Sequence, residues 1–139
     1  MLSNSQGYAF GPPMIVMQTA ATPDNSSVME FNWTFADAEV PNNEFYVNLF
    51  FAEFEFRTSR TFDVYLNGRF FYSAPQKYLL ISILYSTIPL NASSQYLWAL
   101  NSTGVSPLPP FINAGEAFTA MHLTQAATDS RDGVSLPVD

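Results

Sequence analysis

Apolar and polar residues alternate with a period of two through most of the chain, and this pattern constrains the fold more than any other feature. In Thr61–Leu66, Phe62, Val64 and Leu66 are predicted on one face of a strand, and Asn67-Gly68 follows directly. Both central residues of a type I′ turn need a positive φ, so Asn-Gly between alternating runs is typical of a β-hairpin. We therefore predict a hairpin with a second strand beginning at Arg69.

Similar patterns predict five further strands, at Val28–Phe35, Phe45–Phe56, Tyr78–Tyr85, Gln95–Asn101 and Phe111–Leu123. The first of these turns Met29, Phe31, Trp33 and Phe35 inward. Phe45–Phe56 is apolar on both faces in its first half, which predicts a central strand, and sends Glu53 and Glu55 together to one side in its second half. Most of the ten prolines fall between these runs. We predict an all-β antiparallel sandwich or jelly roll, with short helices at most.

Composition limits the partners. A chain of 139 residues with 47 % hydrophobic and 16 % aromatic residues can bury one sizeable core. A formal charge of −7 disfavours nucleic acid and anionic membrane surfaces. The absence of cysteine excludes disulfides and a thiolate zinc site. The longest apolar run, Tyr78–Tyr85, is far too short for a membrane helix, and the N-terminus has no signal-peptide pattern.

Catalytic patterns are sparse. Glu53 and Glu55, at i and i+2 on a strand, lie roughly 6.5–7 Å apart on one face, and paired carboxylates serve glycosidases. Because such pairs usually come from different strands, we favour a solvated strand face with Arg57 or Arg60 as partner, and keep a glycosidase as the remote alternative. His122 is the only histidine and has no second metal ligand near it in sequence. We predict no metal, no cofactor and no enzymatic activity.

Two residue classes suggest carbohydrate. Four N-x-S/T triplets are candidate N-glycosylation sites, at Asn25, Asn32, Asn91 and Asn101. Aromatic rings near strand ends could stack on sugar rings, and the candidates for ligand binding are Tyr72, Tyr78, Tyr85 and Trp98. For each of these aromatics the competing interpretation is an ordinary core position.

Four segments, in order, resemble the second lobe of the malectin-like domain of plant receptor-like kinases. Pro13–Ala20 with Thr22-Pro23 and Phe31-Asn-Trp33 resembles its opening, and Phe45–Glu55 resembles its "YVYFHFAEIE" strand. Ser59–Gly68 resembles "TREFNIYLNG", and Ser106–Glu116 resembles "STLPPILNAIE". Together they span most of residues 13–123.

The resemblance implies a jelly-roll sandwich related to carbohydrate-binding modules, at the extracellular face of the plasma membrane. It implies a non-enzymatic module with a carbohydrate or peptide ligand, or a structural lobe that packs on a partner malectin lobe or co-receptor ectodomain. The structural positions carried over are Phe51–Glu53, Phe62–Gly68, Asn113 and Glu116. Gly115 and Ala117 depart from the family, which usually has larger aliphatic residues there, and predict lost packing.

The expected organisation is an extension over residues 1–12, the sandwich lobe over 13–123, and a disordered tail over 124–139. The lobe is expected to be part of a larger ectodomain.

Overall fold

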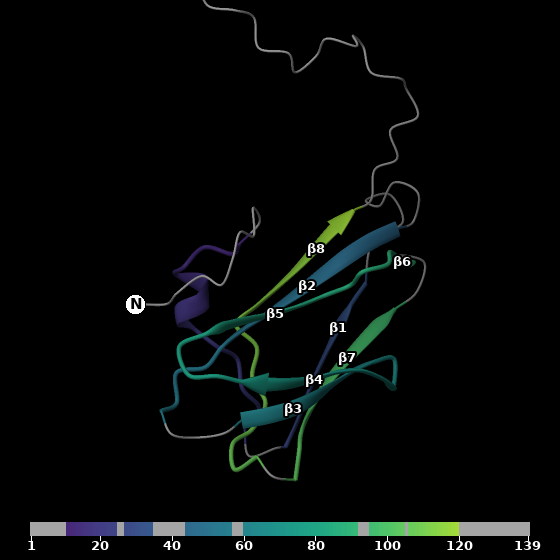
Figure 1. The fold of residues 1–139 in the computed structure, drawn as a ribbon. Helices are drawn as coiled ribbons and strands as arrows, with labels where there is room; N and C mark the ends of the chain where they lie inside the picture. The colour runs from purple at the N-terminus through teal and green to yellow at the C-terminus, as the bar shows by residue number, and fades with distance from the viewer. Residues whose placement is uncertain are drawn as a thin grey trace, which may run out of the picture.

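The computed structural model describes residues 11–24, 27–34, 44–56, 60–91, 95–104 and 106–119. It contains one short 3-10 turn, η1 (Val16–Gln18), and strands arranged in two sheets (Figure 1). The strands are β1 (Val28–Trp33), β2 (Glu44–Ala52), β3 (Arg60–Leu66), β4 (Arg69–Gln76), β5 (Ile81–Tyr85), β6 (Leu90–Asn91), β7 (Tyr96–Ser102) and β8 (Ala114–Thr119). The predicted all-β antiparallel sandwich is confirmed.

The first sheet has the order β1-β7-β3-β4, and every neighbouring pair in it is antiparallel. The second sheet is built on β2, which pairs antiparallel with β5, β6 and β8. Phe45 is opposite Leu90 in β6 and Thr119 in β8, so these two strands lie on opposite edges of β2. Strand β5 shares the edge of β6, because Phe50 pairs with Ile83 on one side and with Ala114 on the other.

Most of the observed strands are shorter than the apolar runs from which they were predicted. Strand β1 ends at Trp33 and β5 begins only at Ile81, while β8 begins at Ala114. The C-terminal part of the last predicted strand and residues 124–139 lie outside the described residues, as do Phe35, Asn25 and His122.

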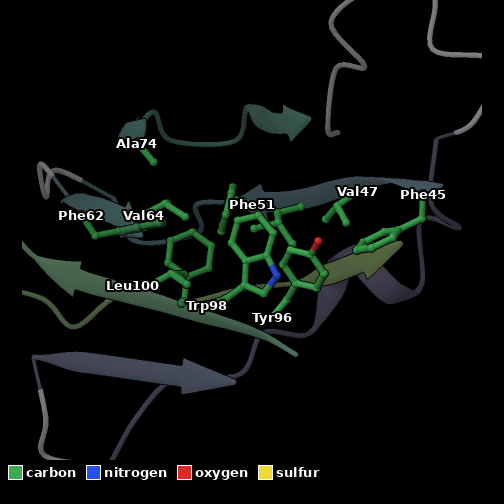
Figure 2. Packing of buried hydrophobic residues seen from close by; sticks show 11 residues of the cluster. Phe45, Val47, Phe51, Phe62, Val64, Ala74, Tyr96, Trp98 and Leu100 are labelled. Atoms are coloured by element: carbon green, nitrogen blue, oxygen red, sulfur yellow. The ribbon is translucent and has the colours of Figure 1, made fainter. Parts of the chain in front are cut away.

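The main core lies between the two sheets. Inward-facing side chains of β2, β3 and β7 form it, and Figure 2 shows Trp98 lying among Phe51, Tyr96 and Leu100. Ring contacts are mostly edge-to-face, the arrangement favoured by the quadrupoles of aromatic rings: Phe51 and Phe62 have centroids 5.2 Å apart. The Tyr96 hydroxyl donates a hydrogen bond to the Asn91 carbonyl. Burial raises the pKa of this phenol, so it remains a neutral donor at physiological pH.

Strand β2 is buried on both faces only in its second half. Its odd positions, such as Val47 and Phe51, enter the main core throughout. On the other face Tyr46 is exposed, whereas Phe50 and Ala52 are buried against Met17 of η1. The predicted central strand is confirmed, since β2 has β8 on one edge and β5 and β6 on the other. Its burial on both faces lies in the second half because η1 covers that end, and local apolar content does not reveal where this cover lies.

The predicted hairpin is confirmed. Leu66 pairs with Arg69, and Asn67 and Gly68 between them have φ values of 50° and 74°. Asn67 also binds the neighbouring strand: its N–H donates to the Leu97 carbonyl, and its Oδ1 accepts the Leu97 N–H, each at 2.8 Å. The turn therefore both reverses the chain and continues the pairing of β3 with β7.

The glycine of this turn gives a test of the hairpin. Gly68→Ala places a Cβ at a positive φ, although nothing lies within 4 Å of it, and should cost about 1 kcal/mol of unfolding free energy. Gly104→Ala is the matched control, since its surroundings are equally open and its φ lies outside the left-handed range. Urea unfolding measures both. Equal stability of the two variants would contradict the turn geometry.

Candidate functional site

The four aromatic residues proposed from the sequence as ligand contacts lie in different settings. Tyr72, Tyr78 and Tyr85 are each 44–50 % exposed, whereas Trp98 is 1 % exposed in the main core. Trp98 is thus a core residue and cannot present its ring to a ligand. Tyr72 lines a cavity of ≈ 80 Å³ between β4 and β5, and Tyr78 packs edge-to-face on Phe56 at 5.0 Å.

A larger groove, of ≈ 510 Å³, opens at the other edge of the sandwich, between β1 and β8. Three large apolar side chains, Met29, Phe31 and Trp33, line it from β1. The rest of the lining is mainly small, with Ala20, Ala21, Ala114 and Gly115 beside Thr19, Ile112 and Asn113. Its volume falls in the range of small-ligand sites, about 300–1,000 Å³.

The aromatic floor of the groove is continuous with the core. The Phe31 ring stacks on Trp98 with centroids 6.4 Å apart, and Trp33 meets Phe31 edge-to-face at 6.2 Å. All three groove-facing side chains of β1 are only half-buried. The sequence pattern correctly places them on the inward face, but they lie where the first sheet ends and nothing in the described part of the chain closes over them.

The polar side chains of the groove are largely engaged within the protein. Asn113 Oδ1 accepts the Ala52 N–H at 2.6 Å, and its Nδ2 donates to the carbonyls of Met17 (3.2 Å) and Thr19 (2.7 Å). The Thr19 hydroxyl donates to the Val16 carbonyl at 3.1 Å. Asn113 therefore fixes the segment after η1 against β2, and the lining carries no charged side chain.

Gly115 gives the groove its shape. A Cβ at this position would lie 2.9 Å from Cη2 of Trp33, closer than real Cβ atoms approach, and 3.0 Å from its Cζ2, which is also tight. The expected packing loss at Gly115 is therefore wrong, because the Trp33 indole occupies the space that a larger aliphatic residue would fill. The sequence signal for the groove was the pair of small-residue stretches, Ala20-Ala21 and Ala114-Gly115, facing a strand of large residues.

The expected solvated face at Glu53 is also wrong. Glu53 is 2 % exposed and Arg60 is 7 % exposed, and their side chains form an ion pair with 2.8 Å between Oε2 and Nε. The second carboxylate oxygen accepts the Glu55 N–H at 2.8 Å. Arg60 also donates to the Pro109 carbonyl at 3.1 Å and lies 4.7 Å from the Phe111 ring centroid.

This cluster fixes the start of β3 and the Pro-rich segment before β8 onto the end of β2. Of the two arginines considered as partners, Arg60 lies beside Glu53, and Arg57 lies outside the described residues. Glu55 is exposed. Within the described residues no group of three or more His, Asp or Glu side chains could hold a metal ion.

The described glycosylation candidates differ in exposure. Asn32 is exposed on the outer face of β1, and Asn91 is exposed at the end of β6. Asn101 is half-buried within β7, between Val28 and Asp63, and its Oδ1 is buried.

A family model described as the Malectin-like domain matches residues 2–120 of the chain. The chain belongs to this family. Similar proteins of Arabidopsis thaliana include "Probable LRR receptor-like serine/threonine-protein kinase At1g51810", 37 % identical over 89 % of this chain, and "Receptor-like protein kinase At3g21340", 34 % identical over 94 %. This malectin-like chain spans 15 % of the length of each of these relatives.

A solved structure with a similar fold is "Bacteroides uniformis beta-glucuronidase 2 covalently bound to cyclophellitol-6-carboxylate aziridine", with a TM-score of 0.53. It is 18 % identical, and the match covers 86 % of this chain and 13 % of that one. At this identity the likeness concerns the sandwich fold alone. No helix in the described part of the malectin-like chain is long and apolar enough to cross a membrane.

The close approach of Gly115 and Trp33 can be tested by a double-mutant cycle. Gly115→Ala should displace the indole, shift the tryptophan fluorescence and lower the unfolding free energy by about 1 kcal/mol. In a Trp33→Ala background the same change should cost nothing, because the clashing ring is gone. Additive costs in a urea-unfolding cycle would contradict the contact.

The buried ion pair predicts a contrast between the two neighbouring glutamates. Glu53→Gln should lower the unfolding free energy by about 3–5 kcal/mol, because it leaves the Arg60 charge buried without its partner. Glu55→Gln, at an exposed position, should change it by no more than about 0.5 kcal/mol. Chemical denaturation of both variants measures the difference, and similar losses would refute the structural role given to Glu53.

Proposed function

We propose that this malectin-like chain is a non-enzymatic ligand-binding module of a receptor ectodomain, acting at the extracellular face of the plasma membrane. The observation that carries the proposal is the groove between β1 and β8, with Met29, Phe31 and Trp33 on one side and small residues on the other. Half-buried aromatic rings in a concave site provide contact area at little cost in conformational entropy. The candidate ligands are a cell-wall carbohydrate or a peptide.

The receptor setting is supported by the relatives, which are receptor-like kinases matched over most of this chain. Exposed Asn32 and Asn91 fit a glycosylated extracellular module, and we propose them before Asn101 as glycan sites because Asn101 is half-buried in a central strand. The glycosidase alternative loses support: Glu53 is held by Arg60 and by a backbone N–H, so it is not placed as a free acid or base.

A structural role is the second candidate. Met14, Ile15 and Val16 are consecutive apolar residues and all are exposed, Ile15 by 74 %. A contiguous apolar surface of this kind favours packing against another lobe or ectodomain. This role and ligand binding use different surfaces, because the groove does not include these three residues.

The test is a combined glycan and peptide array probed with the chain and with two variants. Trp33→Ala removes the largest groove side chain and should reduce binding of any true ligand at least tenfold. Tyr72→Ala is the matched control, an aromatic truncation on the opposite edge strand β4. Loss of binding in the Tyr72 variant alone would move the ligand site to the β4–β5 side, and no binding by the chain would favour the structural role.

A further inference from the structure

The edge of β1 that faces away from β7 lies beside the groove, which is lined by Met29, Phe31 and Trp33 of this strand. Among the described strands β1 pairs only with β7. The Ser102 N–H donates to the Ser27 carbonyl at 2.7 Å, which makes Ser27 and the odd-numbered residues of β1 the hydrogen-bonded positions toward β7. The backbone N–H and C=O groups of Glu30 and Asn32 therefore point away from the sheet, at its outer edge.

The side chains and the backbone groups of β1 are both arranged as an added antiparallel strand would require. Met29, Phe31 and Trp33 are half-buried and face the groove, while Glu30 and Asn32 are exposed on the opposite face. An extended chain paired antiparallel with this edge would place every second side chain into the groove. Its intervening residues would exchange backbone hydrogen bonds with Glu30 and Asn32.

The hydrogen-bonding capacity of the groove distinguishes a peptide from a sugar. The side chains of Asn113 and Thr19 already bind backbone groups, which leaves the Trp33 indole N–H as the remaining polar side-chain atom of the lining. A sugar hydroxyl buried against the apolar side chains of this lining would lose its water without gaining a side-chain partner there, which costs about 1–3 kcal/mol for each unsatisfied group. Apolar side chains carry no such penalty.

The charges in β1 and just before it indicate the sign of the charge that a bound peptide should carry. The described charged residues in β1 and in the segment that precedes it are acidic: Glu30 and Asp24. The described basic residues belong to β3 and β4 or follow them directly, and β4 is the opposite edge of the first sheet: Arg60, Arg69 and Lys77. A cationic segment therefore fits the β1 edge better than an anionic one.

We propose that the β1 edge binds an extended peptide by antiparallel strand addition, with alternating apolar side chains in the groove and basic residues facing outward. This inference rests on the proposed ligand-binding function and specifies its ligand class and binding mode. It assigns Met29, Phe31 and Trp33 as the side-chain contacts, and Glu30 and Asn32 as the backbone contacts.

The probe is the peptide acetyl-Lys-Val-Lys-Val-Thr-Val-Lys-amide, titrated into the full chain by calorimetry. A peptide of the same composition with the three valines together should bind at least tenfold more weakly, because it cannot alternate. Replacing the lysines by glutamates should also weaken binding at least tenfold, and the affinity for the original peptide should fall as salt rises. Trp33→Ala should lower the affinity for the original peptide at least tenfold. Phe70 is exposed on β4, and Phe70→Ala should bind the peptide as the unchanged chain does.

Backbone methylation tests the pairing without altering the protein. N-methylation of the Thr residue and the lysine between the valines, which would donate to β1, should abolish binding. N-methylation of the valines should leave the affinity within about threefold of that of the unmethylated peptide. Amide hydrogen exchange of Glu30 and Asn32 should slow when the peptide is bound. Antiparallel strand addition would be overturned if binding were lost with both methylated peptides or with neither of them. It would also be overturned if the Glu30 and Asn32 amides gained no protection when the peptide is bound.

A neutral cello-oligosaccharide in the same titration separates the two proposals. Binding of the sugar but not the peptide, lost in Trp33→Ala, would overturn strand addition and leave the ligand-binding function standing. No binding of either probe, together with an empty array, would overturn both.

Discussion

The fold depends on β2, the strand whose neighbours lie on every side. It pairs with β5, β6 and β8 within its sheet, packs on the first sheet through Phe45, Val47, Leu49 and Phe51, and accepts η1 on its outer face through Phe50 and Ala52. Ala52 also donates its N–H to Asn113. Because both ends of the described chain are fixed through this strand, its second half determines where η1 and the chain entering β8 can lie.

The end of β2 also explains why a charged pair is tolerated in an apolar protein. Strand β2 ends at Ala52, Glu53 forms an isolated bridge with Tyr78, and one carboxylate oxygen of Glu53 accepts the Glu55 N–H. Its second oxygen requires a cation, which Arg60 supplies from the first residue of β3. The ion pair thus joins the end of β2 in one sheet to the start of β3 in the other.

Local patterns predicted the parts of the fold that are governed by local rules. The Asn67-Gly68 turn and the inward faces of β1 and β3 follow from turn geometry and from the two-residue period, and both were correct. The burial of Glu53, the cover on Phe50 and the tight contact of Gly115 with Trp33 depend on segments distant in sequence. No single-strand pattern contains that information, so these features were misassigned or missed.

The location of the groove likewise depends on contacts between distant segments, which single-strand patterns do not contain. Aromatic residues near turns were the natural candidates for a ligand surface, yet Trp98 is enclosed by two sheets, whereas Trp33, with the same inward orientation, is only half-buried. The difference is strand order: among the described strands β7 has a neighbour on each side and β1 has one. A sandwich with an uncovered edge strand exposes core-facing rings and backbone donors in one place, and Gly115 keeps that place open by leaving room for Trp33 rather than filling it. The constraint that defines the site is therefore the position of β1 at the end of the strand order in the described part of the chain, which sequence periodicity cannot reveal.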